Sequence, residues 1–290
     1  MESTSIHPGT QVGRVALRVA DLARSLAFYE GVLGFQRVEV GNGKASLGAL
    51  DGSPLLDLIE LPDAPPQPRT AAGLYHVAIL LPSRADLGQA LRRLAEARIN
   101  IGQADHLVSE ALYCSDPDDN GLEIYRDRPR SEWHWANGRV QMATDPLDLD
   151  AILAEGDNAG HPWAGLPAGT RIGHMHLQVG DIAQAQQFYH SVLGFDIVAS
   201  MPSALFVSAG GYHHHIGMNI WHSRGAGPSP KNTAGLGMFE LTVPDQAALE
   251  AVKARLVAHD IPMQEQGSEV IVADPWQNEI HLVIVPLPMT

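Results

Sequence analysis

The sequence lacks several features that define other protein classes. Its 290 residues include a single cysteine, Cys114, so no internal disulfide can form and the cytoplasm is the expected location. No apolar run approaches the roughly 20 residues that a membrane-spanning helix needs, so no membrane association is expected. Residues 1–13 do not have a basic stretch followed by an apolar one, and we therefore expect no secretory signal.

Positive charge is also scarce. Lysine and arginine number 19 against 33 acidic residues, which gives a formal net charge of −14 and argues against a nucleic-acid partner, whose phosphates would be repelled. Cys114 and Ser115 lack the surroundings of a catalytic nucleophile, and no glycine-rich phosphate loop is present. Histidine, in contrast, is abundant: 14 residues, several of them grouped in GHMH (173–176) and YHHHIG (212–217). Histidine is a common metal ligand and acid–base group near neutral pH.

The chain contains an internal duplication, which determines the expected architecture. GRVALRVADLARSLAFYEGVLGF at 13–35 matches GHMHLQVGDIAQAQQFYHSVLGF at 173–195, an offset of 160 residues. Two further pairs of segments match in the same order: 73–94 with 235–256, and 116–125 with 274–283. Each half therefore consists of two similar units.

Each unit begins with an apolar–polar alternation typical of a strand, as at Val15, Leu17 and Val19. In the first and third units an aspartate, Asp21 or Asp181, follows at a helix N-cap position, and short strand-like pieces with turn residues come next. The pattern predicts an α+β fold of four βαβββ modules.

We expect these modules to form two tandem domains. The first domain spans 11–127 and contains modules one and two, and the second spans 169–287 and contains modules three and four. Residues 128–168 form the predicted linker, with a short helix near 148–155.

These motifs resemble a known family. A first strand, a helix that ends in FY..VLGF, and a final strand of the type DPDDNGLEIY are similar to the vicinal oxygen chelate superfamily. That superfamily includes glyoxalase I, the bleomycin resistance proteins and the extradiol ring-cleaving dioxygenases. Four modules in one chain resemble the dioxygenase branch, of the catechol 2,3-dioxygenase type.

The resemblance implies metal ligands at two positions of each module, one on the first strand and one on the last. The first-strand positions are Arg14, His76, His174 and Met238, and the last-strand positions are Asp57, Glu123, Asn219 and His281. His76, Glu123 and His174 are good ligands, and together they make the two-histidine, one-carboxylate set of non-heme Fe(II), with Mn(II) as the alternative metal. Since they belong to modules two and three, we expect these two modules to close on each other.

A second ligand set competes with this one. It uses His174, His281 and one member of His213–His215, and we rank it lower because it lacks a carboxylate.

Any single histidine on an apolar strand can also be a hydrogen-bonded core residue rather than a ligand. A carboxylate such as Glu123 between apolar neighbours is harder to explain without a partner, because its burial is costly.

Three other residues are implied as catalytic. Tyr113, ten residues before Glu123, resembles the active-site tyrosine of extradiol enzymes. His215 resembles their acid–base histidine, and strand alternation would place His213 on its face and His214 on the opposite one. His176 shares a face with His174. We expect His106 and His214 only to line the cavity or support the ligands.

The expected function is that of an Fe(II)-dependent extradiol dioxygenase that cleaves a small aromatic diol with O₂, and we expect a homo-oligomer. One alternative is a redox-neutral glyoxalase-like enzyme, but such enzymes usually need four protein ligands, and Arg14 occupies a ligand position. The other alternative is a non-catalytic binding or resistance protein, which would need no metal. Metal analysis separates the last class from the others, and oxygen uptake with catechol separates the first two.

Overall fold

The computed structural model describes residues 5–286. Residues 1–4, part of the stretch in which no signal is expected, and residue 287, the predicted end of the second domain, lie outside this range. Among the described residues, no helix is both long and apolar enough to cross a bilayer.

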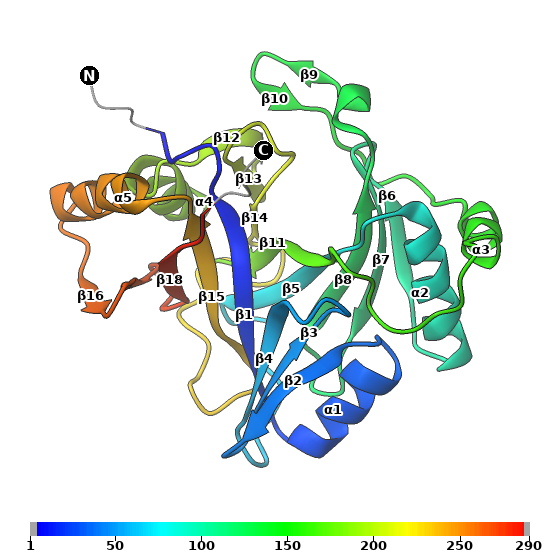
Figure 1. Cartoon of the computed structure of the whole chain (residues 1–290). Helices are drawn as coiled ribbons and strands as arrows, with labels where there is room; N and C mark the ends of the chain where they lie inside the picture. The colour runs from blue at the N-terminus through cyan, green and yellow to red at the C-terminus, as the bar shows by residue number, and fades with distance from the viewer. Residues whose placement is uncertain (1–4, 287–290) are drawn as a thin grey trace.

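All four predicted βαβββ modules are present, and modules one and two occupy the first half of the chain (Figure 1). Module one consists of β1 (Gln11–Val19), α1 (Leu22–Gly31), β2 (Gln36–Gly41), β3 (Lys44–Gly48) and β4 (Pro54–Glu60). Module two consists of β5 (Gly73–Leu80), α2 (Arg84–Glu96), β6 (Gly102–Asp105), β7 (Ser109–Ser115) and β8 (Gly121–Asp127).

Modules three and four repeat this order. Module three consists of β11 (Arg171–Gln178), α4 (Ile182–Gln186) continued by the π-helical η2 (Gln187–Val192), β12 (Asp196–Met201), β13 (Ala204–Ser208) and β14 (Ile216–Asn219). Module four consists of β15 (Gly235–Val243), α5 (Gln246–Ala258), β16 (Met263–Gln266), β17 (Glu269–Ala273) and β18 (Glu279–Ile284).

The predicted helix starts are confirmed. Asp21 accepts a hydrogen bond from the Arg24 amide at 2.9 Å, and Asp181 accepts one from the Gln184 amide at 2.8 Å. Each aspartate thus caps amide groups that the first turn of its helix leaves free. After the helices, Gly34 and Gly194 have φ angles of 80° and 89°, which glycine adopts without strain.

The strands form two eight-stranded sheets, and each sheet combines one module from each half of the chain. One sheet has the order β12-β13-β14-β11-β5-β8-β7-β6, and the other has the order β16-β17-β18-β15-β1-β4-β3-β2. We call the first the 2/3 sheet and the second the 1/4 sheet, after their modules. At their centres β5 pairs antiparallel with β11, and β1 pairs antiparallel with β15. The expected closure of module two on module three is confirmed.

The repeated sequence motifs form hydrogen bonds between the two modules of each half. The Tyr29 hydroxyl, from the FY motif of α1, donates to Asp116 at 3.0 Å, and the Tyr189 hydroxyl donates to Asp274 at the same distance. Both aspartates belong to the DP motif that precedes the last strand of the next module. These contacts are consistent with the division into 11–127 and 169–287, which stays a prediction because the sheets run across it.

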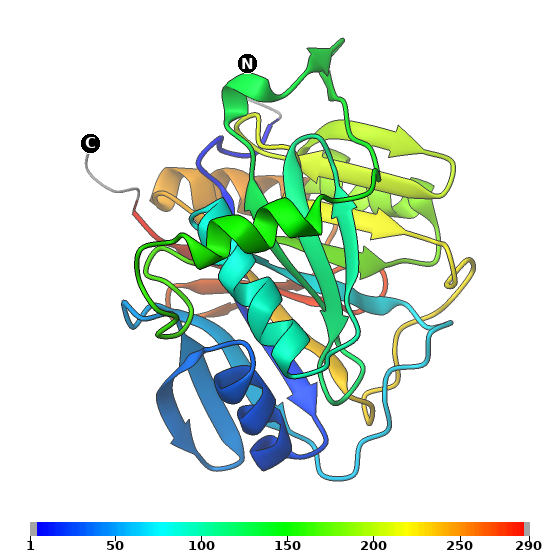
Figure 2. The ribbon, with the colours of Figure 1, turned by 90° about the vertical axis from the view of Figure 1, so that its right-hand side faces the viewer.

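The predicted linker has structure of its own: η1 (Arg130–Glu132), a small hairpin of β9 (Trp135–Ala136) and β10 (Arg139–Val140), and α3 (Leu149–Asp157). The helix expected near 148–155 is thus confirmed. Figure 2 shows α3 lying across α2. This close crossing requires a small residue, because a Cβ added to Gly88 would lie 2.2 Å from the Ile152 carbonyl oxygen.

Candidate metal centre

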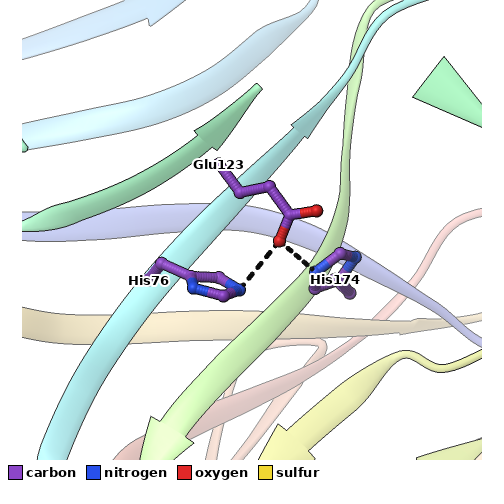
Figure 3. Close-up of side chains that lie close together, drawn as sticks. All are labelled: His76, Glu123 and His174. Carbon is purple, nitrogen blue, oxygen red and sulfur yellow. Dashed lines mark hydrogen bonds and ion pairs between the residues drawn. The ribbon is translucent and has the colours of Figure 1, made fainter. Parts of the chain in front are cut away.

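The centre of the 2/3 sheet brings two histidines and one glutamate together. His76 lies on β5, His174 on the neighbouring β11, and Glu123 on β8 at the other side of β5. Figure 3 shows both imidazoles directed at the same carboxylate oxygen. The His76 Nε2 lies 2.9 Å and the His174 Nε2 lies 3.0 Å from Glu123 Oε2.

The donor atoms of this set fit a metal ion. One ligand atom from each residue lies within 4.8 Å of the other two, and among the described residues this is the one such group of three or more. The His76 Nε2 is buried, and despite its short distance to Glu123 it makes no hydrogen bond of acceptable geometry. A buried nitrogen that is aimed at a carboxylate without bonding to it is suited to a shared cation.

Burial controls the electrostatics of this centre. Burial lowers the pKa of His174 to about 4, although the Glu123 charge acts in the opposite direction. Burial also raises the pKa of Glu123, but the charge and hydrogen bond of His174, together with the nearby His76, outweigh that effect and hold its pKa well below the usual range. The centre therefore favours a neutral His174 imidazole and an ionised Glu123 carboxylate, the protonation states in which these groups bind metals.

A sequence comparison now identifies the family. The model of the Glyoxalase/Bleomycin resistance protein/Dioxygenase superfamily matches residues 11–124 and 171–282. The chain belongs to this superfamily. A catechol-2,3-dioxygenase of Bacillus subtilis (strain 168) is 48% identical over 277 residues, which cover 94% of this chain and 96% of that protein.

Solved structures share the superfamily fold. Glyoxalase I from Zea mays has a TM-score of 0.56 at 15% identity, with 95% of this chain and 92% of that chain covered. A proposed dioxygenase from Bacillus subtilis has a TM-score of 0.66 at 14% identity, with 98% and 86% covered. At such identities the likeness concerns the fold alone.

We call His76, Glu123 and His174 the triad. Two of the predicted catalytic residues, Tyr113 and His176, lie beside it. Tyr113 is the direct cross-strand neighbour of Glu123, and its hydroxyl lies 2.6 Å from the His106 Nε2. Because the His106 Nδ1 lies 2.6 Å from the Ala143 carbonyl oxygen, which only accepts, Nδ1 carries the hydrogen and Tyr113 donates to Nε2. Burial, and then the Glu123 charge, raise the pKa of Tyr113 well above its usual range. The phenol stays neutral and keeps its lone pairs free to accept a hydrogen bond.

His176 is the cross-strand partner of His76, with ring centres 4.8 Å apart. The Asn219 amide donates to the His176 Nε2 at 3.0 Å, while the Asn219 Oδ1 accepts from the Trp221 amide at 3.1 Å. Asn219 occupies the last-strand ligand position of module three, and here it fixes His176 in place. Burial lowers the pKa of His176 well below its usual range, so this ring is neutral.

The structure does not bring His215 against the triad. Its Nδ1 accepts from the Ala209 amide at 3.1 Å, and its ring packs on Tyr212. It also borders a separate pocket with Arg130 and Arg171. The histidine that lies beside the triad is His214, whose ring centre is 4.1 Å from that of His174.

The reason for this difference is local. β14 begins at Ile216, so His213–His215 form a loop, and the alternation expected of a strand does not apply to them. The expectation that His213 shares a face with His215, opposite His214, was therefore based on the wrong backbone conformation.

The competing ligand set is not assembled. His281 lies on β18 in the 1/4 sheet, where its nitrogens contact Glu269 at 3.1 Å and Glu279 at 2.8 Å. Because His174 lies in the 2/3 sheet, His281 and His174 cannot belong to one ligand set.

Sequence reasoning missed an aromatic cluster beside the triad. Tyr75 lies 4.9 Å from His176 and 5.3 Å from Trp221 between ring centres, and the Trp221 side of this cluster is 48% exposed. Trp221 is thus the exposed end of an aromatic cluster whose other end, His176, is buried beside the metal centre. Tyr75 and Trp221 are far apart in the sequence and share no motif, so no sequence signal indicated that they lie close together.

Proposed function

We propose that this chain is an Fe(II)-dependent extradiol dioxygenase that cleaves a catechol-like aromatic diol with O₂. The observation that carries this proposal is the convergence of His76, Glu123 and His174. The 48% identity to a catechol-2,3-dioxygenase supports the ring-cleavage chemistry. Mn(II) is the alternative metal for the same donor set, and homo-oligomeric assembly stays a prediction.

His76, His174 and Glu123 would hold the metal. Three protein ligands leave coordination positions open, and a bound divalent ion supplies Lewis acidity that lowers the pKa of a diol hydroxyl. The surrounding residues contribute binding and proton handling. Tyr113, whose own hydrogen is donated to His106, can accept a hydrogen bond from a substrate hydroxyl.

The aromatic cluster, exposed at Trp221, gives the substrate ring a surface to approach. Tyr75 and Trp221 pack edge to face, and His176 adjoins both rings. Flat aromatic substrates pack well against such rings. We assign Tyr75 and Trp221 to ring binding and His176, held by Asn219, to the polar wall of the same site.

Proton transfer is better matched by His214 than by His215. A general acid or base must reach its substrate through a hydrogen bond or a single water, and His214 packs against a ligand while His215 does not. The role that the sequence assigns to His215 therefore passes to His214 in this proposal.

Anaerobic loading with Fe(II), followed by catechol and O₂, tests the function. The expected result is stoichiometric O₂ uptake and a yellow ring-opened semialdehyde. Metal analysis of the same sample should give one ion per chain, and His174→Ala should reduce that content. Metal-loaded protein that consumes no O₂ with any catechol would overturn the proposal in favour of redox-neutral chemistry, and protein that binds no metal would favour a binding role.

A further inference from the structure

A chain of hydrogen bonds leads from His214 away from the metal centre. The His214 Nδ1 lies 2.8 Å from the His213 Nδ1, and the His213 Nε2 lies 2.9 Å from Asp127 Oδ1. His213 is fully buried, and its ring is enclosed by Tyr212 and Trp133. The other ring nitrogen of His214, Nε2, has no partner among the described residues.

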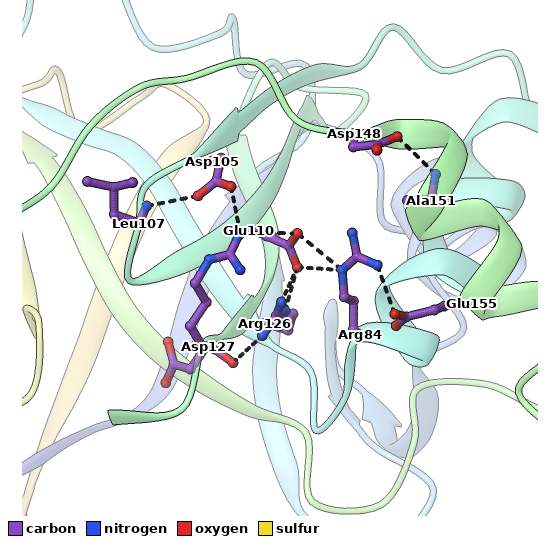
Figure 4. Close-up of polar contacts among 10 residues, drawn as sticks. Arg84, Asp105, Leu107, Glu110, Arg126, Asp127, Asp148, Ala151 and Glu155 are labelled. Carbon is purple, nitrogen blue, oxygen red and sulfur yellow. Dashed lines mark hydrogen bonds and ion pairs between the residues drawn. The ribbon is translucent and has the colours of Figure 1, made fainter. Parts of the chain in front are cut away.

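The Asp127 carboxylate is available to His213 although arginines flank it. The Arg126 side chain pairs with Glu110, and Arg128 donates to Asp105 at 2.5 Å. In Figure 4 the Asp127 carboxylate points away from Arg84 and Arg126, and only its backbone carbonyl contacts Arg126. Among the described residues its side chain accepts hydrogen bonds from His213 and from the Tyr212 hydroxyl alone.

These partners determine where the hydrogens lie. A carboxylate only accepts, so the His213 Nε2 carries a hydrogen. A neutral His213 then accepts at Nδ1, and the hydrogen between the two histidines belongs to the His214 Nδ1.

We infer that Asp127 and His213 act as positioning residues that hold His214 in the Nδ1–H form, which leaves its Nε2 as a proton acceptor. A buried hydrogen bond to one ring nitrogen is a general way to select the form of the other. The catalytic meaning of this inference rests on the proposed function, because an unprotonated Nε2 beside the metal centre is suited to take a proton from a diol hydroxyl. The hydrogen positions themselves do not depend on that function.

The direct test is long-range ¹H–¹⁵N NMR of the metal-free protein labelled at histidine. We expect His213 as the neutral Nε2–H form and His214 as the neutral Nδ1–H form. A doubly protonated His213 near neutral pH, or His214 in the Nε2–H form, would overturn the inference. This measurement needs no variant and no activity.

Asp127→Ala supplies the second measurement. Removal of the acceptor frees His213 to adopt either form, so His214 should become a mixture of the two forms. In the iron-loaded enzyme kcat with catechol should fall about 10- to 100-fold, within the contribution of general acid–base catalysis. KM and metal content should remain near the parent values, because Asp127 touches neither the triad nor Tyr75.

Asp105→Ala is the matched control. It removes a carboxylate that binds Arg128 and not His213, so both NMR spectra and kcat should match the parent. If Asp127→Ala left the His214 spectrum unchanged, the positioning role would be wrong. If the spectra behaved as expected while the parent enzyme consumed no O₂, the proposed function would fail and the positioning of His214 would stand.

Discussion

The 2/3 and 1/4 sheets place different chemistry at equivalent positions. In the 2/3 sheet the first- and last-strand ligand positions hold His76, Glu123, His174 and Asn219. In the 1/4 sheet they hold Arg14, Asp57, Met238 and His281. The Arg14 guanidinium donates to Glu240 at 3.0 and 3.2 Å and lies 3.5 Å from Asp57.

Both sheets have carboxylates near their centre, and in the 1/4 sheet Arg14 places a cation beside them. Arg14 supplies a permanent positive charge to Asp57 and Glu240, since its guanidinium does not lose its proton. Glu123 faces two histidines, and burial favours the neutral form of His174. At equivalent positions, one sheet therefore holds an arginine beside carboxylates and the other holds two histidines beside a carboxylate. The arginine supplies the positive charge in one sheet, and a metal ion can supply it in the other.

The largest expected effect comes from the triad itself. Glu123→Ala or His174→Ala should remove bound metal and reduce ring cleavage on the order of 1,000-fold, the scale of several kcal/mol of transition-state stabilisation. His281→Ala, at the equivalent position of the 1/4 sheet, should leave metal content and kcat unchanged. Elemental analysis and O₂ uptake measure both. Equal losses in the two sheets would show that the comparison is wrong.

The next effect separates two neighbouring histidines. His214→Gln should lower kcat about 100-fold or more, because general acid–base groups contribute on that scale. His215→Gln should change kcat less than about threefold, since the His215 ring hydrogen-bonds the Ala209 amide away from the triad. Steady-state kinetics of the iron-loaded variants, with metal content measured in parallel, distinguish the two. A larger loss for His215 would restore the role that the sequence assigned to it.

The sequence was sufficient to predict the architecture and the convergence of His76, Glu123 and His174. Period-two strands, capping aspartates and the repeat at an offset of 160 residues indicated four modules, because these features depend on local geometry and duplication. The poor ligands at Arg14 and Met238 indicated that modules two and three close together. The convergence of His76, Glu123 and His174 followed from their equivalent positions.

The surroundings of the triad could not be predicted in the same way. The position of His214 depends on a loop that interrupts the strand pattern before β14, and loops have no fixed side-chain period. Asp127 and His213 meet through contacts between residues 86 apart in sequence, and Tyr75 and Trp221 come from different modules. Such contacts depend on how loops pack, which repeat alignment does not specify.

Acid should destabilise the 2/3 sheet first. Burial lowers the pKa of His174 from 6.5 to about 4 and that of His215 from 6.5 to about 3. As pH falls from about 6.5 to about 4, the unfolded chain binds protons that the folded chain does not, so the free energy of unfolding decreases. The 1/4 sheet has no buried histidine among the residues that the structure describes.

Hydrogen exchange of the metal-free protein at pH 7.5 and pH 5 measures this difference. The amides of β5 and β11 should lose protection at pH 5 before those of β1 and β15. Urea unfolding should show a lower midpoint at pH 5. Uniform loss of protection in both sheets would mean that the buried histidines do not account for the acid sensitivity.

The smallest expected effect tests the internal cation of the 1/4 sheet. Arg14→Met, which places there the residue found at the equivalent position 238, leaves Asp57 and Glu240 without their cation. Buried acceptors that lose a charged partner cost about 1–3 kcal/mol, and we expect about 1 kcal/mol because the Arg14 side chain is 35% exposed and water can solvate the carboxylates. Urea unfolding at pH 7 measures the change. Arg14→Met combined with Glu240→Gln should recover part of the loss, since the neutral amide needs no cation. Metal content should equal that of the parent in both variants, because the candidate ligands lie in the other sheet.

If Arg14→Met alone is as stable as the parent, Arg14 is not the counterpart of the metal ion. The 1/4 sheet would then tolerate its carboxylates without a cation.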